Sequence, residues 1–498
     1  MARMYRCRTR AGILLLAALL LTGCAGDRNA ETETDAAAPT ESMTETDAQE
    51  AAWQYPDVNY GGGEFRILNL DQLWDMFIRI DVDELNGEAL NDAVYNRNRT
   101  VEDKLNCKIV EKCLENDAGN TITRVTDLAK QTIMANEDAY DVMYLPINQN
   151  TSLVTEGYLL DLQAIPELHL DETWWDQDII GTTTLDGKLY FVSGAANLMA
   201  FDSMWCLFFN ENMMADQGLA EPYDLVREGK WTIDKLAEYC TAVANLNGDE
   251  KFTWKKDGKA VWGISAHINA PEKFYFSANN RTTTVEPDGS IRFTLGTDRF
   301  YSTIDKLAVL LSGKTGMTLK ASTTDFDPDA GGYVYVFTTR RSLFMTAELK
   351  ASLLMRDMED NFGIVPFPKY DEAQENYQTN LVFQLFYMTI PTTNTQVSQT
   401  ATIAEVLTHD SYEKVIPVYY QNVVEHKGLR NENSIEMLEI MRANRGVDLG
   451  MIFNWVGSLR EDIANKLFNG DNQVASIVEK NKPKIESNIA EFVEFLHK

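Results

Sequence analysis

The chain has few cysteines and histidines for its length, and it lacks the common signatures of catalysis. Six cysteines in 498 residues are too few for a disulfide scaffold. The five histidines show no spacing typical of zinc ligands, and no nucleophile elbow, phosphate-binding loop or dinucleotide-binding glycine pattern occurs. Carboxylate pairs such as Asp176 and Asp178 could serve a glycosidase, but 75 acidic residues make such pairs inevitable. These absences favour a protein that is not an enzyme and needs no cofactor.

Positive charge is also scarce. The sequence holds 45 lysines and arginines against 75 acidic residues, which gives a formal net charge of −30. A surface of this charge repels phosphate groups, so nucleic acid is not expected as a partner. The content of 44% hydrophobic and 10% aromatic residues is that of a globular protein. The length is sufficient for two domains of roughly 200 residues each.

Long apolar runs are missing except near the N-terminus, where the order of segments is that of an export signal. Arginines at positions 3, 6, 8 and 10 precede the apolar run 11–21. As a helix this run would span about 16 Å, roughly half of the hydrocarbon layer, which is too short for a membrane span. The run ends in Leu21-Thr22-Gly23-Cys24. This tetrapeptide resembles the bacterial lipobox, whose cysteine is lipidated and becomes the new N-terminus.

The resemblance implies a lipoprotein signal peptide over residues 1–23 and a lipid anchor on Cys24. An ordinary signal peptide with an incidental cysteine is the alternative. Removal of the four arginines of residues 1–23 changes the formal charge to −34. Residues 24–58 are predicted to be an acidic, Ala/Thr-rich tether, because charge repulsion and few large apolar side chains favour an extended chain. We expect a body held at the extracytoplasmic face of the cell membrane, as on a Gram-positive surface.

From about residue 60 onward, apolar segments typical of strands alternate with segments of helical periodicity. The pattern predicts helices over 88–105 and 122–134, and another that begins after the N-cap Thr232. It predicts strands over 65–70, 107–110, 140–145, 188–193, 205–209, 261–266, 333–337 and 381–390. Such alternation is typical of an α/β fold with parallel sheets covered on both faces. Binding sites in these folds lie at the carboxyl ends of strands.

Several segments, in order along residues 60–498, resemble the solute-binding proteins of bacterial ABC importers, in particular the carbohydrate-binding group that includes maltose-binding protein. The residues that carry the resemblance are Asp141 to Tyr144, Glu156 to Leu162, Asp186 to Tyr190, Leu207 to Asn210, Gly218-Leu219, Trp231-Thr232, Arg341 to Met345, Gly363 to Pro366 and Pro368. Two features depart from the family pattern, namely Ser193 where proline is usual and the absence of tryptophan after Met345.

The resemblance implies a two-lobed α/β fold of the periplasmic-binding-protein type II, with crossing strands as a hinge and the ligand cleft between the lobes. The N-terminal lobe would comprise residues 59–198 plus 339–367, and the C-terminal lobe 199–338 plus 368–498. Lobe closure around a carbohydrate, an oligosaccharide above all, would precede docking on a membrane permease. The protein would act as a monomer. Two alternatives stay open: the same fold with a peptide or other polar cargo, and a tethered carbohydrate-active enzyme.

Sugars present apolar C–H faces and a belt of hydroxyl groups, which aromatic rings and planar polar side chains bind. Candidate contacts occupy the ends of strands and the crossing between the lobes. Each has a structural alternative, such as packing below the cleft for Trp74, a turn cap for Asp202 and a first-turn acid for Glu348. The candidates are Trp74, Tyr144, Asn148, Asn197, Asp202, His267, Asn269, Phe274, Glu348 and Trp455. By contrast, Trp231 is predicted to lie in the core.

Two further patterns favour ordinary structure over a special site. The segment 245–256 is similar to the front of a calcium loop, but Glu250 and Lys256 occupy positions that need glycine and a bidentate acid. A surface turn is the preferred interpretation, and no metal site is predicted. Cys107, Cys113, Cys206 and Cys240 stand in apolar contexts and are expected to be free thiols, with a 107–113 disulfide as the alternative.

Overall fold

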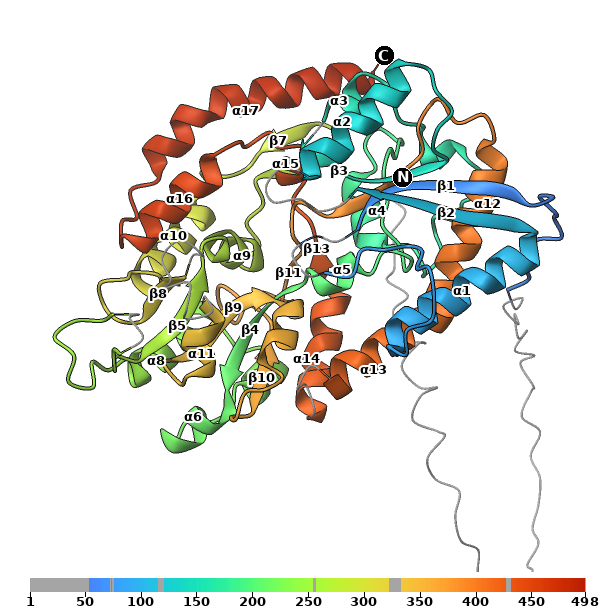
Figure 1. Ribbon diagram of the computed structural model, residues 1–498. Coiled ribbons are helices and arrows are strands. Elements are labelled where there is room, and N and C mark those ends of the chain that lie inside the picture. The colour runs from blue at the N-terminus through green and yellow to red at the C-terminus, as the bar shows by residue number, and fades with distance from the viewer. Residues whose placement is uncertain are drawn as a thin grey trace, which may run out of the picture. The chain divides into compact units, whose positions relative to one another are not determined.

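The computed structural model describes residues 53–71, 73, 76–114, 121–149, 151–253, 257–321, 333–426 and 431–497 (Figure 1). The predicted leader, the lipidation site Cys24, most of the tether and the candidate Trp74 lie outside the described residues. Within the described part, no helix combines the length and the apolar character needed to cross a membrane.

The first sheet is built from early strands of the chain and one late strand. Its order is β12-β3-β1-β2, with bounds Gly63–Leu70 for β1, Cys107–Leu114 for β2, Val142–Pro146 for β3 and Phe386–Thr389 for β12. Strands β1, β2 and β3 are parallel, whereas β12 is antiparallel to β3. Cys107 and Cys113 lie on the same strand and are free thiols, and six residues of extended chain span about 20 Å, which excludes a disulfide between them.

The second sheet has the order β10-β4-β9-β5-β8 and is also mixed. Strands β5, β8 and β9 are parallel, and β4 is antiparallel to both β9 and β10. Their bounds are Trp205–Asn210 for β4, Trp262–His267 for β5, Thr318–Ala321 for β8, Ser342–Glu348 for β9 and Phe362–Val365 for β10. All residues of β4 and β10 are buried, because helices cover this sheet. The sequence predicted parallel sheets, so the antiparallel strands are a correction.

The predicted division of the chain between the lobes is wrong at two segments. Residues 339–367 were assigned to the N-terminal lobe, but they supply β9 and β10, which pair with β4 and β5 of the second sheet. Conversely, β12 belongs to the segment assigned to the C-terminal lobe, yet it pairs with β3 of the first sheet. Backbone hydrogen bonds between strands therefore place these segments in the opposite lobes.

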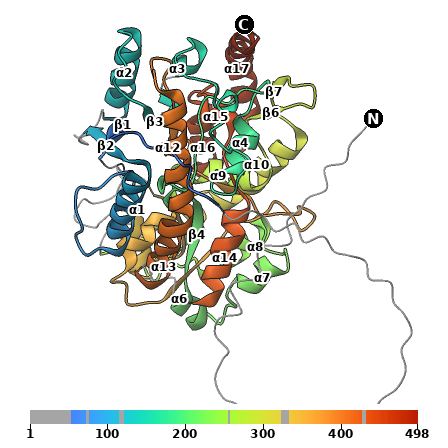
Figure 2. The ribbon, with the colours of Figure 1, turned by 90° about the vertical axis from the view of Figure 1, so that its right-hand side faces the viewer.

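Helices α1 (Ala89–Leu105), α2 (Thr121–Met134), α12 (Val397–Asp410) and α13 (Ile416–His426) pack beside the first sheet. A π-helical turn, η5 (Ser411–Val415), joins α12 to α13, so that the two helices follow one another in Figure 2. The remaining elements around this sheet are short. They are η1 (Ile147–Gln149), α3 (Ser152–Thr155), η2 (Leu162–Ala164) and α4 (Gln177–Thr183), and α5 (Met199–Asp202) leads to the second sheet.

The other helices surround the second sheet. Thr232 caps α8 through a hydrogen bond from the backbone N–H of Lys235, as the sequence predicted. Trp231 is fully buried and donates from Nε1 to the carbonyl of Pro366 at 2.9 Å, so it lies in the core as expected. The helices are α6 (Glu211–Asp216), α7 (Tyr223–Arg227), α8 (Ile233–Val243), α9 (Ala270–Ser277), α10 (Asp298–Leu310), α11 (Tyr333–Thr338), η4 (Leu349–Met355), α14 (Glu432–Ala443), α15 (Leu449–Ile452), α16 (Leu459–Phe468) and α17 (Ala475–Leu496).

Three predicted strands differ from the structure. The run 333–337 forms helix α11, because Val336 packs one face of a helical turn on Ala260 and Trp262. The run 381–390 is only in part a strand, since β11 (Thr379–Asn380) precedes it and pairs with β13 (Arg445–Gly446). Residues 188–193 contribute only two isolated bridges, from Lys188 to Leu185 and from Val192 to Met388. A small hairpin of β6 (Thr283–Val285) and β7 (Ile291–Phe293) completes the fold.

Candidate ligand-binding cluster

Three polar or aromatic side chains meet where strands of the second sheet end. Strand β5 ends at His267 and β9 ends at Glu348. Strand β4 runs in the opposite direction and begins at Trp205, which is the register partner of Glu348. The Trp205 and His267 rings lie 5.2 Å apart. We call Trp205, His267, Asn269, Glu272, Lys273, Glu348 and Arg460 the strand-end cluster.

Trp205 carries a hydrogen-bond donor that the protein does not use. The residue is 1% exposed, and its indole Nε1 has no hydrogen-bond partner in the structure. The Lys273 ammonium group lies 5.4 Å from the centre of its ring. A buried N–H group without an acceptor is uncommon, and one explanation is a partner that binds from outside the chain.

His267 is held as a neutral imidazole. The backbone N–H of Asn269 donates to its Nδ1 at 3.2 Å, which directs the proton of the neutral ring to Nε2. Burial, together with the charges of Lys273, Lys350 and Arg460, lowers the pKa of His267 to about 4. At neutral pH the ring therefore carries no positive charge, its Nδ1 is occupied by the N–H of Asn269, and its Nε2–H is a donor.

Beneath these residues lies a buried ion pair. Lys273 is 2% exposed and donates to Glu272 Oε1 at 2.8 Å, to the carbonyl of Leu381 at 3.3 Å and to Asn380. Burial lowers the pKa of Lys273. The contacts with Asn380 and Leu381 tie the cluster to the chain segment that leads from β11 to the first sheet.

The second carboxylate oxygen of Glu272 has no hydrogen-bond partner. It forms an ion pair with Arg460, whose guanidinium nitrogen lies 3.9 Å away and donates its hydrogen bond to the side chain of Asn269 at 2.9 Å. Glu348 is half-buried, and burial raises its pKa. The cluster thus combines an indole face, an unused indole N–H, a neutral imidazole and carboxylate oxygens. These groups suit a ligand with apolar faces and many hydroxyl groups.

His267, Asn269 and Glu348 were predicted from the sequence as ligand contacts, and the structure brings them together. Trp205, Lys273 and Arg460 were missed. Trp205 was assigned only to a strand, since nothing in the pattern of that strand distinguishes its first residue. Arg460 lies far along the chain in α16, and only the packing of α16 on α9 brings it to the cluster.

Asn197 and Asp202 lie on the crossing between the sheets, where they bind other parts of the chain. Asn197 donates from Nδ2 to the carbonyl of Phe386, and its Oδ1 accepts from the N–H of Met199 at 3.2 Å. Asp202 accepts from the hydroxyl of Tyr419 at 2.7 Å. Both residues are buried, and these bonds give them structural roles at the crossing.

The remaining candidates lie apart from the strand-end cluster. Phe274 is fully buried and meets the Phe367 ring edge-on at 4.8 Å. Trp455 is 5% exposed and stacks on Phe453 at 5.0 Å. Tyr144 faces the interior of the first lobe, where burial raises its pKa. Asn148 is 7% exposed, and its Oδ1 has no hydrogen-bond partner, so it keeps an unused acceptor at the end of β3.

The first lobe contains a second group of glutamate, tryptophan and histidine, built around a buried glutamate, that the sequence did not indicate. Glu405 of α12 is 2% exposed. Its Oε1 accepts from Trp174 Nε1 at 2.9 Å and lies 3.1 Å from His169 Nδ1. Its Oε2 accepts from Trp175 Nε1 at 2.9 Å and from the backbone N–H of His169 at 3.2 Å. Both carboxylate oxygens are thus satisfied within the chain.

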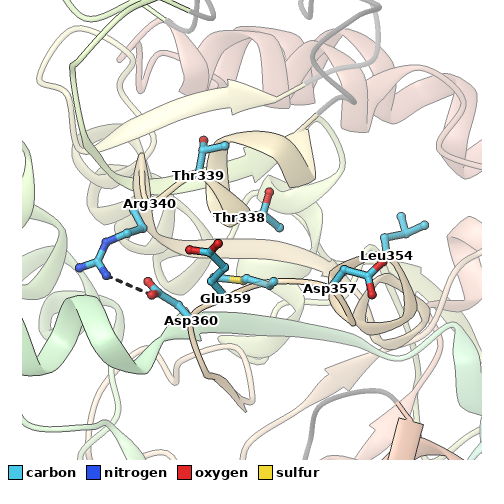
Figure 3. Close-up of a pocket in the computed structure, with 8 residues that line it drawn as sticks. Thr338, Thr339, Arg340, Leu354, Asp357, Glu359 and Asp360 are labelled. Carbon is cyan, nitrogen blue, oxygen red and sulfur yellow. Dashed lines mark hydrogen bonds and ion pairs between the residues drawn. The ribbon is translucent and has the colours of Figure 1, made fainter.

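A hollow of about 470 Å³ lies on the surface of the second lobe (Figure 3). It is lined by Thr338, Thr339, Arg340, Leu354, Asp357, Met358, Glu359 and Asp360. Figure 3 shows the ion pair in which Arg340 reaches Asp360 at 3.0 Å. The hollow lies near the beginning of β9 and β10, whereas Glu348 stands at the end of β9, so it is separate from the strand-end cluster.

The calcium-like segment has a structural use for its central acid. Asp249 Oδ2 accepts from the backbone N–H groups of Lys259 at 2.7 Å and Ala260 at 2.8 Å. These bonds close the turn without an ion, although Lys256 lies outside the described residues. In the described part of the chain, no group of three or more His, Cys, Asp or Glu residues is arranged to hold a metal ion.

No protein-family profile matches the chain, and no curated protein matches its sequence. Solved structures do match. The galacto-N-biose-/lacto-N-biose I-binding protein of an ABC transporter from Bifidobacterium longum, in complex with lacto-N-biose, is 13% identical with a TM-score of 0.57. The match covers 87% of this chain and 98% of that chain.

Two further matches have the same character. A sugar transporter from Rhizobium etli in an open conformation is 13% identical with a TM-score of 0.55, over 87% of this chain and 98% of that one. An ABC substrate-binding protein from Listeria monocytogenes, in complex with cycloalternan, is 13% identical with a TM-score of 0.54, over 86% and 99%. The chain therefore has the two-lobed α/β fold of periplasmic solute-binding proteins, type II, as the sequence predicted.

Proposed function

We propose that this protein is the substrate-binding component of an ABC importer for a carbohydrate. The two lobes would close on the ligand, and the closed form would deliver it to a membrane permease. The observation that carries this proposal is the strand-end cluster on a solute-binding fold. There, the indole N–H of Trp205 and one oxygen of Glu272 lack hydrogen-bond partners beside a neutral His267. The similar structures from Bifidobacterium longum and Listeria monocytogenes contain lacto-N-biose and cycloalternan, which supports a carbohydrate as the cargo.

The chemistry of the cluster favours hydroxyl groups over a strongly charged ligand. Each cation has an acid beside it, since Lys273 binds Glu272 at 2.8 Å and Arg460 binds Glu461 at 2.9 Å. The neutral imidazole of His267 carries its proton on Nε2 and can donate to a hydroxyl oxygen, and the indole N–H of Trp205 has no hydrogen-bond partner. A neutral oligosaccharide satisfies these groups without leaving a buried charge unpaired.

The screen that tests this proposal is thermal unfolding of the protein with a panel of mono- and oligosaccharides and with short peptides. A ligand that binds only the folded state increases the free energy of unfolding, by about 2.7 kcal/mol at a ligand concentration of a hundred times Kd. The melting temperature rises as a result. We expect one group of sugars to stabilise the protein and the peptides to have no effect. Stabilisation by peptides alone would assign the same fold to a peptide cargo, and turnover of a glycan would indicate an enzyme.

We also propose that the protein is exported and anchored through a lipid on Cys24. The order of basic segment, apolar run and lipobox supports this assignment. Mass spectrometry of the mature N-terminus should show a diacylglyceryl group on Cys24, and Cys24→Ala should release the protein from membranes. A mature chain with an unmodified Cys24 would contradict the anchor but leave the binding function open.

A further inference from the structure

The C-terminal helix α17 makes contacts at both lobes. Near its beginning, Val478 is fully buried, and α17 packs against α16 and β7 of the second lobe. At its end, the carbonyl of Leu496 accepts a hydrogen bond from Lys188 Nζ at 2.7 Å, and the Phe495 ring lies 5.7 Å from Tyr190. Lys188 and Tyr190 precede Val192, which pairs with β12 of the first sheet. Figure 1 shows α17 arching from the region of α16 to the first lobe.

A chain of buried aromatic rings continues this contact below the helix. Phe492 of α17 lies 4.4 Å from Phe453 and 5.3 Å from Trp455, both of which follow α15. Phe453 in turn lies 5.7 Å from Phe191, and Phe191 lies 4.9 Å from Tyr387 of β12. Phe191, Phe453 and Phe492 are at most 3% exposed. Separation of the lobes at this place would expose these rings to water, which costs free energy in proportion to the apolar area.

The arch of α17 has a local cause. Pro483 lies inside the helix, where it cannot donate a hydrogen bond and its ring displaces the preceding turn. The bend lets the first half of α17 follow the second lobe while the last turn reaches Lys188 and Tyr190. The helix thus spans the two lobes at a place distinct from the crossing segments of the backbone.

We propose that α17 is a strap that holds the two lobes together in the absence of ligand. The strap opposes lobe opening and therefore increases the fraction of ligand-free molecules that are closed. A ligand binds preferentially to these closed molecules. This inference rests on the proposed lobe closure, but it concerns the empty protein and does not depend on the identity of the cargo. A ligand then has to supply less free energy to complete closure than it would without the strap.

The test measures the distance between the lobes without ligand. Spin labels on Met134→Cys and Val309→Cys report this distance by pulsed electron resonance, because these side chains are 65% and 60% exposed on α2 and α10. The protein without the two introduced cysteines gives the background from native thiols. When the labelled full chain also carries both Phe495→Ala and Lys188→Met, the lobes should separate more often. The ratio of molecules with the long distance to molecules with the short distance should rise about tenfold.

Two matched variants make the outcome decisive. Tyr190→Ala removes the same ring contact from the first lobe and should give a shift in the same direction. Glu491→Ala alters an exposed position on α17 and should leave the distances unchanged. If one strap variant fails to fold, the other still decides the question. Unchanged distances in the folded strap variants would overturn the proposal, whereas failure of every sugar in the ligand screen would leave this result intact.

Discussion

The two lobes each bury a glutamate beside tryptophan and histidine, but they treat these groups differently. In the first lobe, both oxygens of Glu405 accept hydrogen bonds, and the indole N–H groups of Trp174 and Trp175 are used. In the second lobe, the indole N–H of Trp205 has no hydrogen-bond partner, and one oxygen of Glu272 has only an ion pair with Arg460 at 3.9 Å. The same residue types therefore form a complete network in one lobe and an incomplete one in the other.

The difference is between a network completed within the chain and one that the proposed ligand would complete. A complete network stabilises the fold, because removal of any member leaves a buried group unsatisfied. An incomplete network costs stability in the empty protein, and a ligand that supplies the missing partners recovers that free energy on binding. By this criterion, Glu405 fastens the loop 169–175 to α12, and the strand-end cluster is the proposed binding site.

The largest expected effect comes from breaking the complete network. Glu405→Ala leaves two indole N–H groups and the histidine without their acceptor, which should lower the free energy of unfolding by about 3 kcal/mol. Urea denaturation at neutral pH measures the loss, and Glu413→Ala, at an exposed position on η5, provides the control. A loss as small as that of the control would mean that the first-lobe network contributes nothing.

A matched pair of tryptophan substitutions compares the lobes directly. Trp175→Phe deprives Glu405 of a charge-assisted hydrogen bond and should lower the free energy of unfolding by about 2 kcal/mol. Trp205→Phe loses the same ring volume but removes an N–H group that bonds nothing in the empty protein, so its cost should be lower by about 1 kcal/mol. Equal losses in urea denaturation would contradict the distinction between the two networks.

Titration of His267 should contribute to the pH dependence of stability. Its pKa is lowered to about 4 in the folded protein, against an ordinary value of 6.5. Between these values the unfolded chain binds more protons, so the stability from this group rises with pH and is lost as pH falls toward 4. Replacement by His267→Asn should therefore reduce the gain in stability between pH 4.5 and 7.5 by about 2 kcal/mol.

The control for this prediction is His497→Asn, at an exposed position beyond α17, which should preserve the full gain. Urea denaturation at the two pH values gives the comparison. An undiminished gain in His267→Asn would show that the imidazole is not held in the neutral state by its surroundings.

The smallest expected effect concerns Glu348, whose pKa burial raises from 4.5. Its folded form binds the proton more tightly than the unfolded chain, so the stability from this group falls as pH rises through the ordinary glutamate range. Glu348→Gln should therefore equal the natural protein in stability at acidic pH and exceed it at pH 7. The same variant should bind the ligand more weakly. A less stable variant at pH 7 would instead give Glu348 a structural role.

Much of the fold could be predicted because local patterns and packing agree. The helix predicted over 88–105 is α1, Ala89–Leu105, and the strand predicted over 205–209 is β4, Trp205–Asn210. The strand predicted over 333–337 was wrong, because a short segment of valine and aromatic residues has no period that distinguishes a strand from a helix. There, the packing of Val336 on Trp262 decided in favour of the helix.

The candidate site could be predicted only where position along a strand indicates it. His267 and Glu348 end parallel strands of the second sheet; the sequence named His267 after a predicted strand and Glu348 at the start of a predicted helix. Trp205 begins an antiparallel strand, so the rule that sites lie at carboxyl ends passed over it although it reaches the same edge. The Glu405 network could not be predicted from the sequence, because Glu405 is separated from its tryptophan partners by some 230 residues along the chain. The prediction of which lobe contains β9 and β12 was wrong for a related reason, because strand pairing between segments distant in the sequence leaves no local pattern.

The central claim is that a carbohydrate binds at the strand-end cluster, and isothermal titration calorimetry tests it most directly. The sugar that gives the largest thermal shift is titrated into the natural protein, Trp205→Phe and Trp175→Phe. The account predicts tight binding by the natural protein, a loss of about tenfold or more in Trp205→Phe and unchanged affinity in Trp175→Phe. Undiminished affinity in Trp205→Phe would contradict the account, because the ligand would then bind elsewhere.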